Sequence, residues 1–174
     1  MCLGPYMYQK AVVLRDSMLL GTLLSCSEAW YNITEKELVQ LEQVDKSLWC
    51  NLGEVARTVP YDLLCLEFGV EPIRYIIMRR RLIYLQHIMK QKESSLIKKF
   101  FLTQIKSLKK KDWGKTVLED FQHLEINLSF EDIEEMPVET YKTMLKKKIR
   151  NKSLEYLLNK RNTRNGKGME LTYT

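Results

Sequence analysis

The chain has 174 residues, of which 45% are hydrophobic, and carries 28 Lys and Arg against 22 Asp and Glu, a net charge of +6. This length and apolar content fit one domain or two small ones with a hydrophobic core. No apolar run reaches the roughly 18 residues needed to span a bilayer, and the first residues do not form a signal-peptide pattern, so a secreted or membrane protein is not expected.

Cysteine usage points to an intracellular protein, nuclear or cytoplasmic. The four cysteines lie far apart, without a Cys-x-x-Cys pair, and the chain has only two histidines. Neither a zinc site nor a disulfide framework is therefore indicated, and reduced thiols fit best.

Charge alternates along the chain in blocks. Residues 28–71 hold nine acids and three bases, and residues 74–115 hold thirteen bases and two acids. Residues 119–139 hold eight acids and no base, and residues 142–167 hold ten bases and one acid. Such blocks steer polyanions onto parts of a surface or pair with one another.

The N-terminal third predicts three helices. The first covers residues 9–31, with Arg15, Asp16 and Ser17 interrupting its apolar positions. The second covers residues 35–51, opens with a capping box at Thr34 and Glu37, and ends at Gly53. Its expected buried stripe is Leu38, Leu41, Val44, Leu48 and Leu52. The third, residues 61–68, ends at Gly69.

The stretch EPIRYIIMRRRLIYLQHIMKQK, residues 71–92, predicts the central helix of the fold. It is apolar over much of its circumference, which is typical of a helix buried by neighbours on several sides. Arg79, Arg80 and Arg81 interrupt it. Three adjacent cations in such a helix either pair with acidic neighbours, such as Glu67 and Glu71, or contact a nucleic-acid backbone, and the pattern leaves both interpretations open.

Four further helices are expected after the central one. One begins near residues 94–95 with Leu96, Ile97, Phe100, Phe101, Ile105 and Leu108 as its apolar positions. Asp112 can cap the next, Ser129 can cap residues 130–136, and Pro137 precedes a last helix over residues 138–161. The polar tail, residues 162–174, is expected to be disordered.

No period-two strand pattern appears, so the fold class is all-α, with seven or eight helices in an irregular bundle. The segment 53–59 is the expected hinge. The predicted organisation is therefore N-terminal helices over residues 1–53, a helical bundle over residues 54–161 and a flexible tail over residues 162–174.

No catalytic constellation is present. Adjacent carboxylates such as Glu134 and Glu135 point to different faces of a helix, His87 and His123 stand alone, and no Gly-rich phosphate loop occurs. Paired aspartates that could hold two metal ions are also missing. The chain is thus not expected to be an enzyme by itself, and no cofactor or small-molecule substrate is predicted.

Basic helices with interleaved aromatics remain. Two clusters stand out, one from Lys98 to Lys115 around Trp113 and one from Tyr141 to Lys152. Each could follow a phosphate backbone, and each could equally face the acidic block at residues 119–139. Trp30 and Trp113 fit core positions better than stacking positions. The candidate nucleic-acid contacts are Arg79, Arg80, Arg81, Lys109, Lys110, Lys111, Lys146, Lys147 and Lys148.

Several strings resemble the reverse-transcriptase polyprotein of non-LTR (LINE-type) retrotransposons, in the region just after the polymerase palm. They are LRDSML at residues 14–19, SEAWYNIT at residues 27–34, LEFGVEPIRYIIMRRRLIYLQHI at residues 66–88, and the shorter matches at residues 111–113 and 120–121. The resemblance covers about residues 8–160, and none of these strings is a catalytic motif.

The resemblance implies a thumb over residues 11–52 and a helical linker over residues 72–152, which together bind primer–template nucleic acid. The implied partners are RNA or an RNA–DNA duplex and the missing palm domain. Because the palm with its paired aspartates, the zinc knuckle and the endonuclease are absent, the resemblance implies a non-catalytic fragment of an RNA-directed DNA polymerase, a truncated reading frame or a remnant put to another use. The alternative from the residues alone is a structural or protein-interaction bundle whose charge blocks pair internally.

Overall fold

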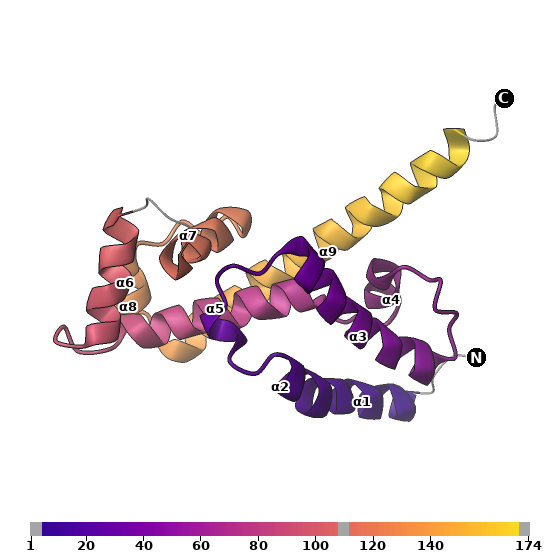
Figure 1. The fold of residues 1–174 in the computed structure, drawn as a ribbon, viewed down its shortest axis with the longest axis horizontal. Helices are drawn as coiled ribbons and strands as arrows, with labels where there is room; N and C mark the ends of the chain where they lie inside the picture. Colours follow the sequence, from indigo (N-terminus) through magenta and orange to yellow (C-terminus); the bar gives the residue numbers. More distant parts are fainter. Residues whose placement is uncertain (1–4, 108–111, 171–174) are drawn as a thin grey trace. The chain divides into compact units, whose positions relative to one another are not determined.

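A computed structural model describes residues 5–107 and 112–170 (Figure 1). Within those ranges the chain forms helices and no strand, which confirms the predicted all-α bundle. The N-terminal half contains α1 (Pro5–Leu14), the π-helix η1 (Arg15–Leu19), α2 (Leu20–Leu23), the 3-10 helix η2 (Ser27–Ala29), α3 (Glu35–Gly53) and α4 (Tyr61–Glu67). It is followed by α5 (Ile73–Met89), α6 (Leu96–Ser107), α7 (Trp113–His123), α8 (Phe130–Glu135) and α9 (Val138–Glu170).

The chain divides into two compact units. The first unit comprises residues 1–25, 35–73 and 151–174, and the second unit comprises residues 26–34 and 74–150. This division differs from the expected boundary at residues 53–59. Val55 and Val59 lie inside the first unit because they pack against its core around Trp49 and Leu64.

The predicted single helix over residues 9–31 is interrupted at Arg15. The backbone widens to a π-helix from Arg15 to Leu19, where the Leu20 N–H donates to the Arg15 carbonyl. The helical run ends at Leu23, and Cys26 takes a left-handed φ of 56° before the short 3-10 helix. The side chain of Arg15, one of the polar residues that interrupt the apolar pattern, is buried against Asp45.

A buried polar cluster holds the first unit together beside its apolar core. Two guanidinium nitrogens of Arg15 donate to the two carboxylate oxygens of Asp45, each at 2.7 Å, and the Tyr61 hydroxyl donates to Asp45 at 2.6 Å. The Arg15 guanidinium also lies 5.8 Å from the ring centroid of Trp49. Of the predicted stripe on α3, Leu38 is buried and Leu52 packs against the core, whereas Val44 is exposed. Asp45 and Trp49, which the stripe did not include, are fully buried.

The helix ends of the second unit match the predicted caps. The Asp112 carboxylate accepts from the Lys115 N–H at 2.9 Å, and Ser129 and Asp132 form a capping box at the start of α8. In the first unit, α4 also ends as predicted: Gly69 has a φ of 58° and the Val70 N–H donates to the Cys65 carbonyl.

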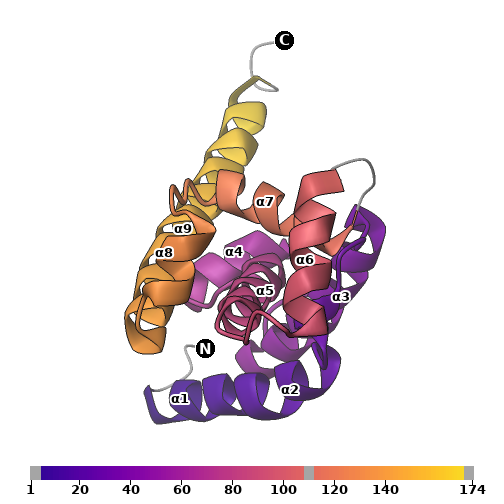
Figure 2. The ribbon, with the colours of Figure 1, turned by 90° about the vertical axis from the view of Figure 1, so that its left-hand side faces the viewer.

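In the second unit, other helices surround α5 over most of its length. Figure 2 shows α5 nearly end-on, with α6 and the first part of α9 on opposite sides of it and α7 above. The side-chain amide of Gln86 donates to the carbonyls of Ile133 and Met136 and so ties α5 to the end of α8. The expectation that the central helix is buried on several sides is confirmed.

The predicted disordered tail is helical as far as the structure describes it. Helix α9 continues to Glu170, and an ion pair of 2.7 Å joins Arg164 to Asp62 within the first unit. This pair joins the last part of α9 to α4, across 102 residues of the chain. Among the described helices, none is both long enough and apolar enough to span a membrane.

Candidate nucleic-acid interface

The first half of α9 presents a basic face to solvent. Tyr141, Leu145 and Ile149, which lie on one side of the helix, are completely buried in the second unit. The opposite side carries exposed basic residues, here called the α9 basic face: Lys142, Lys146, Lys147 and Arg150. Successive residues at i, i+4 spacing, such as Lys142, Lys146 and Arg150, stand about 6 Å apart along the helix.

Two lysines of this helix have partners in the second unit. Lys142 pairs with Glu139 at 2.9 Å, and this contact is weak because both side chains are solvated. Lys148, a predicted phosphate contact, is half-buried and donates to the Glu125 carbonyl at 3.0 Å. Glu125 has a φ of 53°, so Lys148 satisfies a carbonyl in the strained turn after α7. Lys146 and Lys147 are the exposed members of the predicted set on α9.

Arg81, another predicted contact, is buried inside the second unit with only 3% of its surface exposed. One terminal nitrogen lies 2.5 Å from a carboxylate oxygen of Asp120 on α7, and its Nε donates to the Trp30 carbonyl at 3.1 Å. Arg81 thus has an acidic partner from the block at residues 119–139, and a phosphate would have to displace this pair to reach it. The expected partners Glu67 and Glu71 belong to the first unit.

Burial dominates the titration of Asp120. It raises the pKa of the carboxyl group to about 6, although the adjacent Arg81 guanidinium favours the ionised form. At neutral pH the pair is therefore ionised, and its carboxylate takes up a proton in mildly acidic solution.

Arg79 and Arg80 are half-buried on α5. Arg80 donates from one terminal nitrogen to the Ser27 hydroxyl at 3.5 Å. The three adjacent arginines therefore differ in position: Arg81 is an interior group, and Arg79 and Arg80 are accessible in part.

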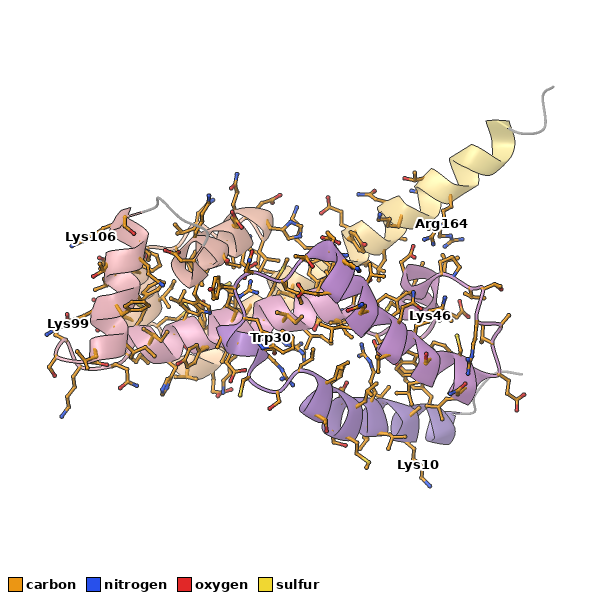
Figure 3. The ribbon with its side chains drawn as sticks, in the orientation of Figure 1. Lys10, Trp30, Lys46, Lys99, Lys106 and Arg164 are labelled. Carbon is orange, nitrogen blue, oxygen red and sulfur yellow. The ribbon has the colours of Figure 1, made fainter. Side chains whose placement is uncertain are left out.

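The lysines on α6 separate in the same way. Lys99 and Lys106 are exposed and point outward from the helix (Figure 3), whereas Lys98 is buried. The Lys98 ammonium donates to Glu93 and to both carboxylate oxygens of Glu134, and the hydrogen bond to Glu93 raises the pKa of Lys98. Of the two interpretations left open for this cluster, pairing with the acidic block at residues 119–139 is therefore the one that holds for Lys98. The remaining predicted contacts, Lys109, Lys110 and Lys111, lie outside the described residues.

Trp113 is a packing residue. Its ring meets Tyr84 and Phe101 edge to face, at centroid distances of 5.9 and 5.4 Å, and its indole N–H donates to the Glu28 carbonyl. The segment around Trp30 likewise contributes to the interior of the second unit, because the Trp30 carbonyl accepts a hydrogen bond from the buried Arg81.

Two basic residues, Arg81 and Lys98, occupy buried helix faces that the sequence analysis did not assign to them. Arg81 lies one helical turn from the buried residues Ile77 and Leu85, and Lys98 lies three residues before the buried Phe101. This spacing was visible in the sequence and placed each cation on an apolar stripe. Asp120, the partner of Arg81, and Glu134, one of the two partners of Lys98, are 39 and 36 residues away, so no local pattern could identify them.

Net charge is unequal between the two units. The residues assigned to the second unit include 18 Lys and Arg against 11 Asp and Glu, a net charge of +7, whereas those of the first unit sum to −1.

In the described part of the chain, no group of three or more His, Cys, Asp and Glu side chains could hold a metal ion.

Comparison of the chain with protein-family models, with curated proteins and with solved structures gave no match.

Proposed function

We propose that the second unit binds a nucleic-acid duplex through the α9 basic face. In this proposal the chain is the thumb and linker part of a non-LTR retrotransposon reverse transcriptase, and its ligand is an RNA–DNA primer–template. The single observation that carries the proposal is the α9 basic face, four cations on one exposed side of a helix whose other side is fully buried.

Charge and burial together support this interface. The buried Tyr141, Leu145 and Ile149 fix the rotation of α9, so Lys146 and Lys147 face solvent without any need for a partner inside the unit. A net charge of +7 on the second unit adds long-range attraction for a polyanion. Contacts of this kind recognise phosphates and not bases, so the binding is independent of sequence.

The proposed role is binding without catalysis. Polymerisation would depend on a palm domain that supplies the metal-binding aspartates, and the chain would work in the nucleus or cytoplasm, where its template is found. The strings at residues 14–19, 27–34 and 66–88 support this assignment by resemblance.

A charge-matched pair of variants tests the interface. Lys142, Lys146 and Lys147 are changed together to Ala, and the control changes Lys10, Lys36 and Arg57, exposed residues of the first unit, to Ala. We expect the α9 variant to weaken filter binding of an RNA–DNA duplex and to lower the salt dependence by about three in slope, whereas the control stays close to wild type. Equal weakening by both variants would show only an effect of net charge.

A second candidate function is a structural or protein-interaction bundle. It is favoured by the pairing of basic and acidic blocks inside the second unit, Arg81 with Asp120 and Lys98 with Glu134, and by the hydrogen bond from Lys90 to the Glu134 carbonyl at 2.6 Å. These contacts consume part of the basic block without any external ligand. Under this alternative, the α9 variant and the Lys109/Lys110/Lys111→Ala variant bind duplex no differently from wild type.

A further inference from the structure

Helix α6 exposes apolar side chains while it buries a lysine. Leu96, Ile97 and Phe100 have exposed fractions of 83%, 41% and 66%, whereas Lys98 and Phe101 face the interior of the second unit. The core of the second unit therefore does not account for the apolar character of this exposed face. The three residues form a compact patch near the start of the helix.

Cations share the exposed side with this patch. Lys99 adjoins Phe100, and Lys106 follows two turns later; both point outward in Figure 3. The sequence of α6, LIKKFFLTQIKS, contains no acidic residue. The lysines on this face thus complement an anionic partner, and the apolar patch beside them complements flat apolar groups on the same partner.

The length of the apolar patch along α6 distinguishes between the possible binding partners. Beyond Phe100, the exposed positions are Thr103, Lys106 and Ser107, all polar. A partner helix requires apolar contacts at each turn, and a helix lying in a membrane surface requires an apolar face along its length. A single-stranded nucleic acid requires an exposed aromatic ring with cations beside it, and this is what α6 offers.

We infer that α6 binds single-stranded nucleic acid, with Phe100 stacking against a base and Lys99 and Lys106 contacting phosphates. This inference rests on the proposed function and adds a second subsite to it. Figure 2 shows α6 and the first part of α9 on opposite sides of α5, so within the second unit the single strand and the duplex occupy different faces.

The test uses the full chain and a single-stranded oligonucleotide of about 12 nucleotides that contains 2-aminopurine, whose fluorescence is quenched by stacking. Phe100→Leu keeps an apolar side chain and removes the ring, and we expect it to weaken binding by about tenfold and to reduce the quenching. Phe100→Trp should keep both. Leu96→Ala is the matched control, because Leu96 is more exposed than Phe100 but has no ring, and it should bind within about twofold of wild type.

The inference is overturned if Phe100→Leu binds the single strand as wild type does, or if Leu96→Ala weakens binding as much as Phe100→Leu. A dimer in sedimentation that Phe100→Leu dissociates would also overturn it, because a second copy would then cover the patch. Duplex binding is measured in parallel. Retained duplex binding with no effect at Phe100 sinks only the α6 subsite, whereas absence of all nucleic-acid binding sinks the proposed function as well.

Discussion

At the scale of single residues, the most informative group is the guanidinium of Arg81. The sequence left open whether Arg79, Arg80 and Arg81 pair with acids or contact nucleic acid, and in the structure Arg81 is buried and paired with Asp120. Both ions of a buried pair lose their hydration. Removing one of them lowers stability strongly, because the other charge is then left buried without a partner.

Removal of one partner should therefore cost more than removal of both. We expect Asp120→Leu to lower the free energy of unfolding by about 3–5 kcal/mol, and Arg81→Met/Asp120→Leu to recover much of that loss. Lys98→Met is the comparison. Its partners Glu93 and Glu134 are 81% and 40% exposed and remain hydrated without the lysine, so this change should lower the free energy of unfolding less than Asp120→Leu does. Urea unfolding measures all three, and a double variant less stable than Asp120→Leu would contradict the account.

Asp120 should also make stability depend on pH. Its pKa is about 6 in the folded chain and near its ordinary value of 3.8 in the unfolded chain, so between these values the folded state binds more protons. Proton binding then favours folding, and this contribution grows as the pH falls from 7 to 4.

The measurement is the difference in unfolding free energy between wild type and Asp120→Asn, which cancels other titrating groups. This difference should increase by about 3 kcal/mol from pH 7 to pH 4 in favour of wild type, at about 1.4 kcal/mol for each pH unit between the two pKa values. A difference that is constant or that decreases toward pH 4 would show that Asp120 does not hold a raised pKa.

At the scale of elements, local signals predicted helix ends better than helix faces. The caps at Asp112 and Ser129 and the end of α4 at Gly69 were all predicted, because each depends on residues within one turn. The burial of Asp45 on α3 and the π-helix at Arg15 were not, because the Arg15–Asp45 pair joins positions 30 residues apart. Periodicity places apolar residues inward and does not identify a buried cation with its partner.

Gly53 illustrates how the reason for a residue can differ from the predicted one. Helix α3 does end there, as expected, but the left-handed residue is the following Glu54, with a φ of 51°. A Cβ at Gly53 would lie 2.8 Å from the Phe68 ring, which stacks on Trp49 at 4.8 Å. Glycine is thus needed at this position for close packing.

Two Gly→Ala changes should consequently have opposite effects. Gly53→Ala forces the Phe68 ring to move and should lower the free energy of unfolding by about 1–3 kcal/mol. Gly21→Ala, in α2, meets no atom within 4 Å and should raise it by about 0.5–1 kcal/mol, because alanine has the higher helix propensity. Thermal or urea unfolding of both variants checks the pair, and stabilisation by Gly53→Ala would refute the packing explanation.

At the scale of the whole chain, charge is the property that bears on function. Blocks of opposite sign were evident in the sequence, and the structure pairs part of them within the second unit. Which lysines remain exposed could not be deduced from composition, because Lys98 and Lys148 differ from Lys99 and Lys147 only in their rotation around a helix. Three of the nine predicted contacts lie outside the described residues. The other six include exposed, half-buried and buried groups.

The salt dependence of duplex binding is the decisive measurement for the α9 basic face. For an RNA–DNA duplex titrated in filter binding over a range of salt concentrations, we expect the logarithm of the affinity to fall linearly with the logarithm of the salt concentration. With about four phosphate contacts on the α9 basic face, the slope should be near −3 to −4. A slope near zero, or no measurable binding at low salt, would contradict the account and leave the internally paired bundle as the better description of this protein.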